Sequence, residues 1–169
     1  MRRCCSFTAA IMLLALGATG ASAQQSIQQF PSLTMEAAVK TATAAMSECR
    51  KQGALVAVAV TDRAGNVLAV LRDPLAGMHT VDTATRKAWT ATSFRNPTSV
   101  LEKATGPATD SNGIRHLPGV AMIGGGLPIE AAGALVGAIG ISGAPGGGLD
   151  EACAKVGIEA IRADLEMGF

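Results

Sequence analysis

Glycine is concentrated near the end of this chain, and that concentration limits what the last third can fold into. Eleven of the twenty glycines lie between Gly119 and Gly148. Two apolar runs, 120–123 and 134–142, separate the glycine clusters, and each has the length of a buried strand. Asp150 follows at once and suits the first turn of a helix, where carboxylates favour the helix dipole. The pattern predicts strand, turn, strand, turn and helix, with small residues that let backbones approach closely.

The segments before this region complete one α+β domain. Consecutive strands joined by short turns favour an antiparallel sheet of about five strands, with helices packed against it. Thr34 is a favourable N-cap for the first helix, and Gly53 can end it. The expected elements are a helix from Thr34 to Gly53, strands over 54–61 and 67–71, helices over 80–94 and 98–104, the two strands of the glycine region with 128–130 between them, and a last helix over 149–167.

The first 23 residues are typical of an export signal. Arg2 and Arg3 form a positive start, the run 9–18 is apolar but too short to span a membrane, and residues 21–23 (ASA) match a cleavage site. We expect a Sec-type signal peptide over 1–23 that is cleaved after Ala23. The mature chain would then be a single domain over 24–169 in the periplasm or outside the cell.

Charge and aromatic content argue against a nucleic-acid partner. The formal net charge is +1, which becomes −1 once Arg2 and Arg3 are removed with the signal. The chain has no tyrosine and no stripe of basic residues interleaved with aromatics. Nucleic-acid binding is therefore disfavoured. No other stretch has the length and apolar character of a membrane span.

Cys49 and Cys153 remain in the predicted mature chain. In an oxidising compartment such a pair is a candidate disulfide, which would join the end of the first helix to the start of the last. Two separate buried thiols are the alternative, because free cysteine is often fully buried.

Common catalytic and nucleotide-binding motifs are absent from the sequence. There is no P-loop, no G-x-G-x-x-G and no metal-binding spacing of cysteine or histidine, so we predict no metal site. Residues 140–144 (GISGA) resemble a nucleophile elbow around Ser142. Both histidines precede that serine, however, which is the wrong order for a hydrolase. A binding protein is therefore favoured over an enzyme.

The remaining candidates for ligand contact are few. His79 and His116 could each be a single ligand to a metal-containing group, and cationic side chains follow or flank them: Arg86, Lys87 and Arg115. Solvated loop histidines and an ordinary charged surface are the alternative interpretation. The turn of Gly124, Gly125 and Gly126 could also bind a carboxylate through its backbone N–H groups.

Several motifs together resemble the GlcG/HbpS haem-binding family. They are the segment from Leu33 to Gly53, D-R-A-G-N-V-L, T-R-K-A-W-T-A with F-R-N-P-T, G-G-G-L-P-I, and G-A-I-G-I-S-G with the following D-E. Each is weak alone, but the combination covers nearly all of the mature chain. The resemblance implies a profilin-like layered α/β/α fold with a central antiparallel sheet, homo-oligomers, and haem binding in some members.

The resemblance favours an exported protein that binds haem b without a covalent bond, in a sensing, storage or redox-stress role. His79 or His116 would be the axial ligand, and Arg86, Lys87 or Arg115 would lie near the propionates. One alternative is an accessory protein or enzyme that acts on a small organic acid or aldehyde. Another is a structural oligomer with no ligand.

Overall fold

The computed structural model of the protein describes residues 26–168. The predicted signal peptide over 1–23 and its cleavage site lie outside that range. One antiparallel sheet has the strand order β2-β1-β4-β3, with β1 at Ala57–Asp62, β2 at Val67–Arg72, β3 at Gly126–Ala131 and β4 at Ala134–Ser142. The α+β class is confirmed, although the described residues form four strands where about five are expected. Among residues 26–168, no helix combines the length and apolar character needed to cross a bilayer.

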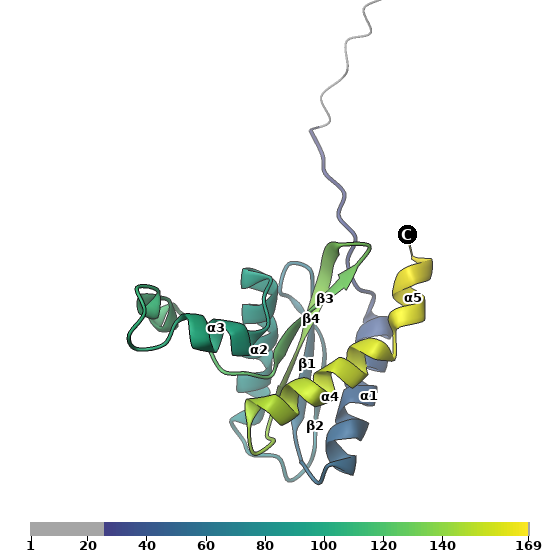
Figure 1. The fold of residues 1–169 in the computed structure, drawn as a ribbon. Coiled ribbons are helices and arrows are strands. Elements are labelled where there is room, and N and C mark those ends of the chain that lie inside the picture. Colours follow the sequence, from purple (N-terminus) through teal and green to yellow (C-terminus); the bar gives the residue numbers. More distant parts are fainter. Residues whose placement is uncertain (1–25, 169) are drawn as a thin grey trace, which may run out of the picture.

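Helices cover both faces of the sheet (Figure 1). One face is covered by α1 and α4, and the other by α2, which α3 follows. Thr34 caps α1 as predicted, because its Oγ1 accepts a hydrogen bond from the backbone N of Ala37 at 3.2 Å. The helix bounds are Met35–Lys51 for α1, Thr80–Phe94 for α2, Thr98–Ala104 for α3, Gly147–Glu159 for α4 and Arg162–Met167 for α5, with a 3₁₀ turn, η1, at Asn112–His116.

The first strand of the glycine region does not lie where the sequence pattern places it. The run 120–123 is irregular, and the strand is instead β3, which contains Pro128. A proline is tolerated there because β3 is an edge strand of the sheet. Ala132 and Gly133 join β3 to β4 with φ angles of 47° and 77°. Two positive φ angles are typical of a type I′ hairpin turn, so this turn fixes the pairing.

The predicted last helix is divided in two. It begins at Gly147, two residues earlier than expected, and α4 ends at Glu159 before the short α5. Ile161 leaves the helical backbone, with φ −112° and ψ 6°, and its side chain is fully buried in the core. The chain therefore turns at the point where this isoleucine enters the core.

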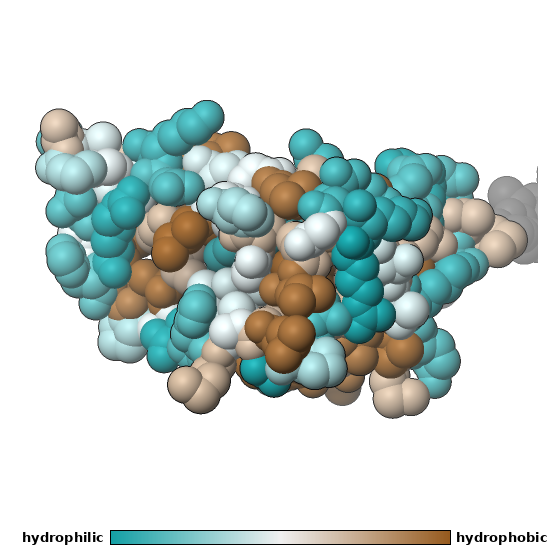
Figure 2. Space-filling model, turned by 90° about the horizontal axis from the view of Figure 1, so that it is seen from below, coloured by the Kyte–Doolittle hydropathy of each residue, from teal (hydrophilic) through white to brown (hydrophobic). Residues whose placement is uncertain are grey.

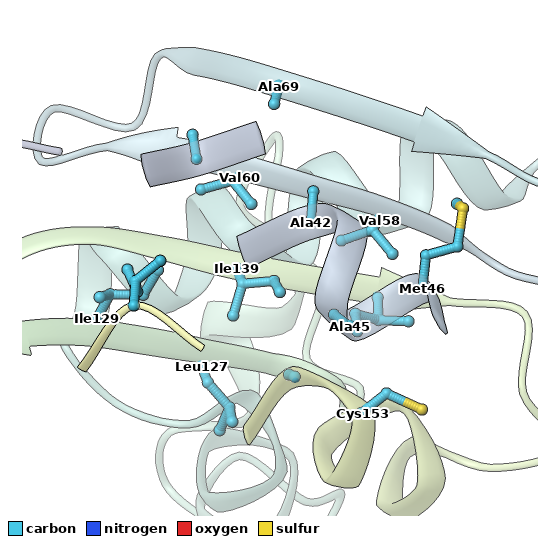
Figure 3. Close-up of a cluster of buried hydrophobic side chains, with 14 of the residues drawn as sticks. Ala42, Ala45, Met46, Val58, Val60, Ala69, Leu127, Ile129, Ile139 and Cys153 are labelled. Atoms are coloured by element: carbon cyan, nitrogen blue, oxygen red, sulfur yellow. The ribbon is translucent and has the colours of Figure 1, made fainter. Parts of the chain in front are cut away.

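The face of the sheet toward α1 and α4 carries the larger apolar side chains. Alternation along β1 directs Val58 and Val60 to this side, and β4 directs Ile139 and Ile141 there. All four are fully buried. Figure 3 shows valine and isoleucine side chains from the strands beneath the small residues of α1, with Cys153 of α4 at the edge of the cluster. This is the main hydrophobic core.

The opposite face, toward α2, is built mostly from alanine and glycine, with Thr61 of β1 bonded to Thr92 of α2 at 3.0 Å. Ala57 and Ala59 of β1 are fully buried against Ala84 of α2. Gly126 and Gly140 are partners in adjacent strands. A Cβ on Gly140 would lie 2.1 Å from the carbonyl oxygen of Ala84, far inside contact distance. The backbone of α2 therefore lies directly on the backbone of the sheet.

The helices α1 and α4 are also held close together. The structure joins Cys49 to Cys153 by a disulfide, with their Cα atoms 5.5 Å apart. Gly157 of α4 faces α1, where an added Cβ would lie 2.7 Å from the carbonyl oxygen of Thr41. The disulfide and this close approach thus join the same two helices at two separate points.

Candidate functional site

A cleft of about 380 Å³ opens where the start of α2, the end of β4 and the loop into α4 meet. The loop over 143–147 contributes mostly backbone to its wall. These segments lie at the lower end of the molecule in Figure 1, and Figure 2 views that end, where apolar and polar patches alternate. The side chains other than alanine that line the cleft are those of His79, Thr80, Thr83, Lys87, Ile123, Ser142 and Asp150.

An ion pair between Lys87 and Asp150 forms the base of the cleft. Lys87 Nζ lies 2.8 Å from Asp150 Oδ2 and also donates to the carbonyl oxygen of Ile141 at 2.8 Å. Each of the paired side chains exposes only 3% of its surface. Burial raises the pKa of Asp150, while the hydrogen bond and charge of Lys87 oppose that rise. The carboxyl group therefore takes up a proton more readily than an ordinary aspartate does.

Lys87 does not lie on an ordinary charged surface, which is the alternative to its predicted role near a propionate. It lies on the buried stripe of α2 with Ala84, Ala88 and Ala91, and that stripe faces the sheet. The sequence analysis predicts Asp150 only as a first-turn carboxylate and does not predict the pair. The helical spacing of Lys87 could have revealed the pair. Lys87 follows Ala84 by three residues and precedes Ala91 by four, which places it on the apolar stripe of the helix, and a lysine buried there needs an anionic partner.

His79 is the candidate axial ligand that lines the cleft. It directly precedes α2, and its side chain makes no capping hydrogen bond to that helix. Its ring lies close against the backbone of Gly77, where an added Cβ would be 2.8 Å from His79 Cε1. The imidazole is exposed and, among the described residues, forms no side-chain hydrogen bond. Its nitrogens are therefore free to bind a ligand.

The other three predicted ligand residues lie away from the cleft. Arg86 is on the exposed side of α2, where its Nε lies 2.8 Å from Asp82 Oδ2. Arg115 and His116 belong to η1, beyond α3. The guanidinium of Arg115 donates to the backbone carbonyls of the α3 segment that it packs against. The structure thus brings together His79 and Lys87, but not Arg86, Arg115 or His116.

The glycine turn over 124–126 does bind carboxylates, but they are the protein's own. Gly124 N donates to Glu102 Oε2 at 3.0 Å, and Gly125 N donates to Glu151 Oε1 at 3.4 Å. Gly126 N donates to the hydroxyl of Thr98 at 2.8 Å. These three N–H groups are therefore not available to a ligand, and the turn instead fixes α3 and α4 to the sheet.

Within residues 26–168, no three histidine, cysteine or acidic side chains gather in a way that could hold a metal ion. The groups at the cleft that can contact a ligand are an exposed imidazole, a buried ammonium paired with a carboxylate, and hydroxyls, together with loop backbone. An imidazole can bind a metal centre and an ammonium can bind an acidic group, so these residues suit the binding of a molecule that carries both better than they suit hydrolysis.

Comparisons with known proteins agree with the fold and identify a family. The family model described as haem-degrading protein HbpS-like matches residues 33–159. The crystal structure of HbpS is 43% identical with a TM-score of 0.76, covering 80% of this chain and 94% of that one.

Two further relatives extend the comparison. The crystal structure of a PduOC:heme complex is 29% identical with a TM-score of 0.73, covering 78% of this chain and 96% of that one. An uncharacterized 15.0 kDa protein from the dhaT-dhaS intergenic region of Citrobacter freundii is 31% identical over 118 residues, which are 69% of this chain and 83% of that protein. The chain belongs to the HbpS-like family.

Proposed function

We propose that this protein binds haem b without a covalent bond, in the cleft beside His79. The observation that carries the proposal is the free imidazole at the rim of a cleft in a chain of the HbpS-like family. A relative with the same fold has been crystallised as a haem complex. Bound haem would supply an iron centre able to respond to oxidants.

The residues at the cleft fit such a group. Haem needs an axial ligand, apolar surface for the ring and a polar partner for the propionates. His79 can supply the axial nitrogen. Ile123 lines the cleft and exposes 51% of its surface, and Met78, next to His79 in the chain, exposes 93%. Exposed apolar side chains of this size beside a free imidazole suit the face of a porphyrin.

Titration of the purified protein with hemin tests this proposal. We expect a saturable change in the Soret band that ends near one hemin per chain. His79→Ala should weaken binding and shift the Soret maximum, whereas His116→Ala, at a histidine outside the cleft, is the matched control and should match the unaltered protein. If hemin causes no saturable Soret change, haem binding is refuted. If His79→Ala behaves as the control does, His79 is not the ligand.

We further propose that the protein is exported and forms a homo-oligomer, in a haem-sensing, storage or redox-stress role. The sequence of residues 1–23 supports export, and the family resemblance supports self-association. Mass spectrometry of the periplasmic or secreted protein should give a chain that begins at Gln24. Light scattering after size exclusion, with and without hemin, should give a multiple of the chain mass; a monomer in both states would contradict the oligomer.

A further inference from the structure

The base of the cleft holds hydrogen-bond donors that the fold itself does not use. An ammonium has three N–H groups, and Lys87 places two of them on Asp150 and on the carbonyl of Ile141. The third has no acceptor among the described residues, although Lys87 lines the cleft. Ser142 also lines the cleft, and its hydroxyl makes no hydrogen bond within residues 26–168. No fully buried side-chain oxygen in that range lacks a partner, so this hydroxyl is reachable from the solvent. Lys87 and Ser142 therefore bring two donors to the lining of the same cleft.

The surroundings of these donors favour an anion of modest size. The cleft wall includes Gly146 and Gly147, at a helix N-terminus that no side chain caps. The unpaired N–H groups of such a terminus give a positive potential. Asp150 is the one acidic side chain among the described residues of the lining, and its Oδ2 already accepts from Lys87, so the cleft carries no unpaired carboxylate that would repel an anion.

We propose that Lys87 and Ser142 form a carboxylate subsite, which accepts the carboxylate of a ligand that enters the cleft. A carboxylate matches the site because its two oxygens can accept from the ammonium and the hydroxyl together. The carboxylate could belong to a haem propionate or to a free small organic acid. The assignment to a propionate rests on the proposed haem function, whereas the subsite itself does not.

The first experiment uses the free protein and a small acid. Isotope-labelled protein is titrated with sodium propionate and, separately, with propionamide, while the backbone amide signals around Ser142 are followed by NMR. We expect a saturable shift with propionate and none with the amide. Ser142→Ala keeps the ion pair and should weaken the propionate effect several-fold. Lys103→Met, on the exposed side of α3, is the control and should leave it unchanged.

A double variant tests the ammonium without leaving one buried charge alone. Lys87→Met with Asp150→Leu replaces the pair by apolar groups of similar size, a change that proteins often tolerate. It should abolish the propionate shift. If propionate and propionamide act alike, or if neither Ser142→Ala nor the double variant reduces the effect, the subsite is overturned.

The second experiment identifies the source of the carboxylate. Binding of hemin is compared with that of hemin dimethyl ester, which lacks both carboxylates. If a propionate occupies the subsite, we expect hemin to bind about tenfold more tightly, as a charge-assisted hydrogen bond allows, and the double variant to remove that preference. If hemin and its dimethyl ester bind equally tightly while sodium propionate still shifts the amide signals, the subsite is assigned to free acids. If neither porphyrin binds, the haem proposal fails, and the NMR titration still decides the subsite.

Discussion

A single methyl group at Gly140 should separate α2 from the sheet. A Cβ there would lie 2.1 Å from the carbonyl oxygen of Ala84 and 2.5 Å from the backbone N of Ala88, where ordinary contact begins at 3.4 Å. Both neighbours are backbone, so no side chain can rotate away. Helix α2 must withdraw by about 1.3 Å at this point, since that is the shortfall in distance.

Overpacking of a dense core costs about 1–3 kcal/mol, and here the withdrawal also stretches the Lys87–Asp150 pair. We therefore expect Gly140→Ala to lower the free energy of unfolding by about 3 kcal/mol, which corresponds to a fall in melting temperature of roughly 6–12 °C. Urea unfolding followed by circular dichroism, with the disulfide intact, measures this change.

Gly148 provides the matched control for the same substitution. It lies in the first turn of α4, and an added Cβ would meet nothing within 4 Å. Gly148→Ala should therefore stabilise the protein by up to about 1 kcal/mol, because alanine favours the helix. If Gly140→Ala changes the free energy of unfolding by less than about 0.5 kcal/mol, the size of an ordinary surface change, the account of the α2 interface is refuted.

Three further predictions follow from local features. The disulfide between Cys49 and Cys153 closes a loop with a sequence separation of 104, so replacing both by alanine should cost up to about 4.7 kcal/mol in urea unfolding on the chain-entropy account; a cost near zero would contradict it. Burial would raise the pKa of Asp62, but hydrogen bonds from Asn66 and the turn backbone hold it below its ordinary value of 3.8. The stabilisation by the Asp62 carboxylate is thus present above pH 3.8 and is lost as the pH falls through the lower pKa of the folded protein. Asp62→Ala should therefore lower the free energy of unfolding at pH 7 but much less at pH 2, and an equal decrease at both pH values would count against this account. Ala132→Asn would give the favoured Asn-Gly sequence in the type I′ turn and should raise the melting temperature, for a gain of about 0.5–1 kcal/mol; a lower melting temperature would argue against this turn.

Elements that depend on a local signal could be predicted from the sequence. Thr34 and Gly53 define the ends of α1, and the run over 134–142 is β4. The run over 120–123 has the same apolar character but is not a strand. What distinguishes 126–131 is a hairpin turn and an edge position that tolerates Pro128, and neither is visible in the apolar pattern.

The candidate site was less predictable because its groups come from distant parts of the chain. His79 and Lys87 are only eight positions apart, and both were identifiable as candidates. Asp150 reaches Lys87 only because α4 begins beside the end of β4, which the spacing of residues in the sequence does not reveal. For the same reason, the partners of the glycine turn, Glu102 and Glu151, were not predicted.

The alanine and glycine face of the sheet has a consequence for how the layers are aligned. A surface with so few protruding side chains offers α2 little in the way of ridges or grooves, so van der Waals contact alone would set its distance from the strands better than its position along them. Polar contacts supply the alignment: Thr61 of β1 bonds Thr92 of α2 at 3.0 Å, and Lys87 bonds the end of β4. The Lys87 ammonium also pairs with Asp150, on a helix at the other side of the sheet, and so fastens the two outer layers to each other at one point.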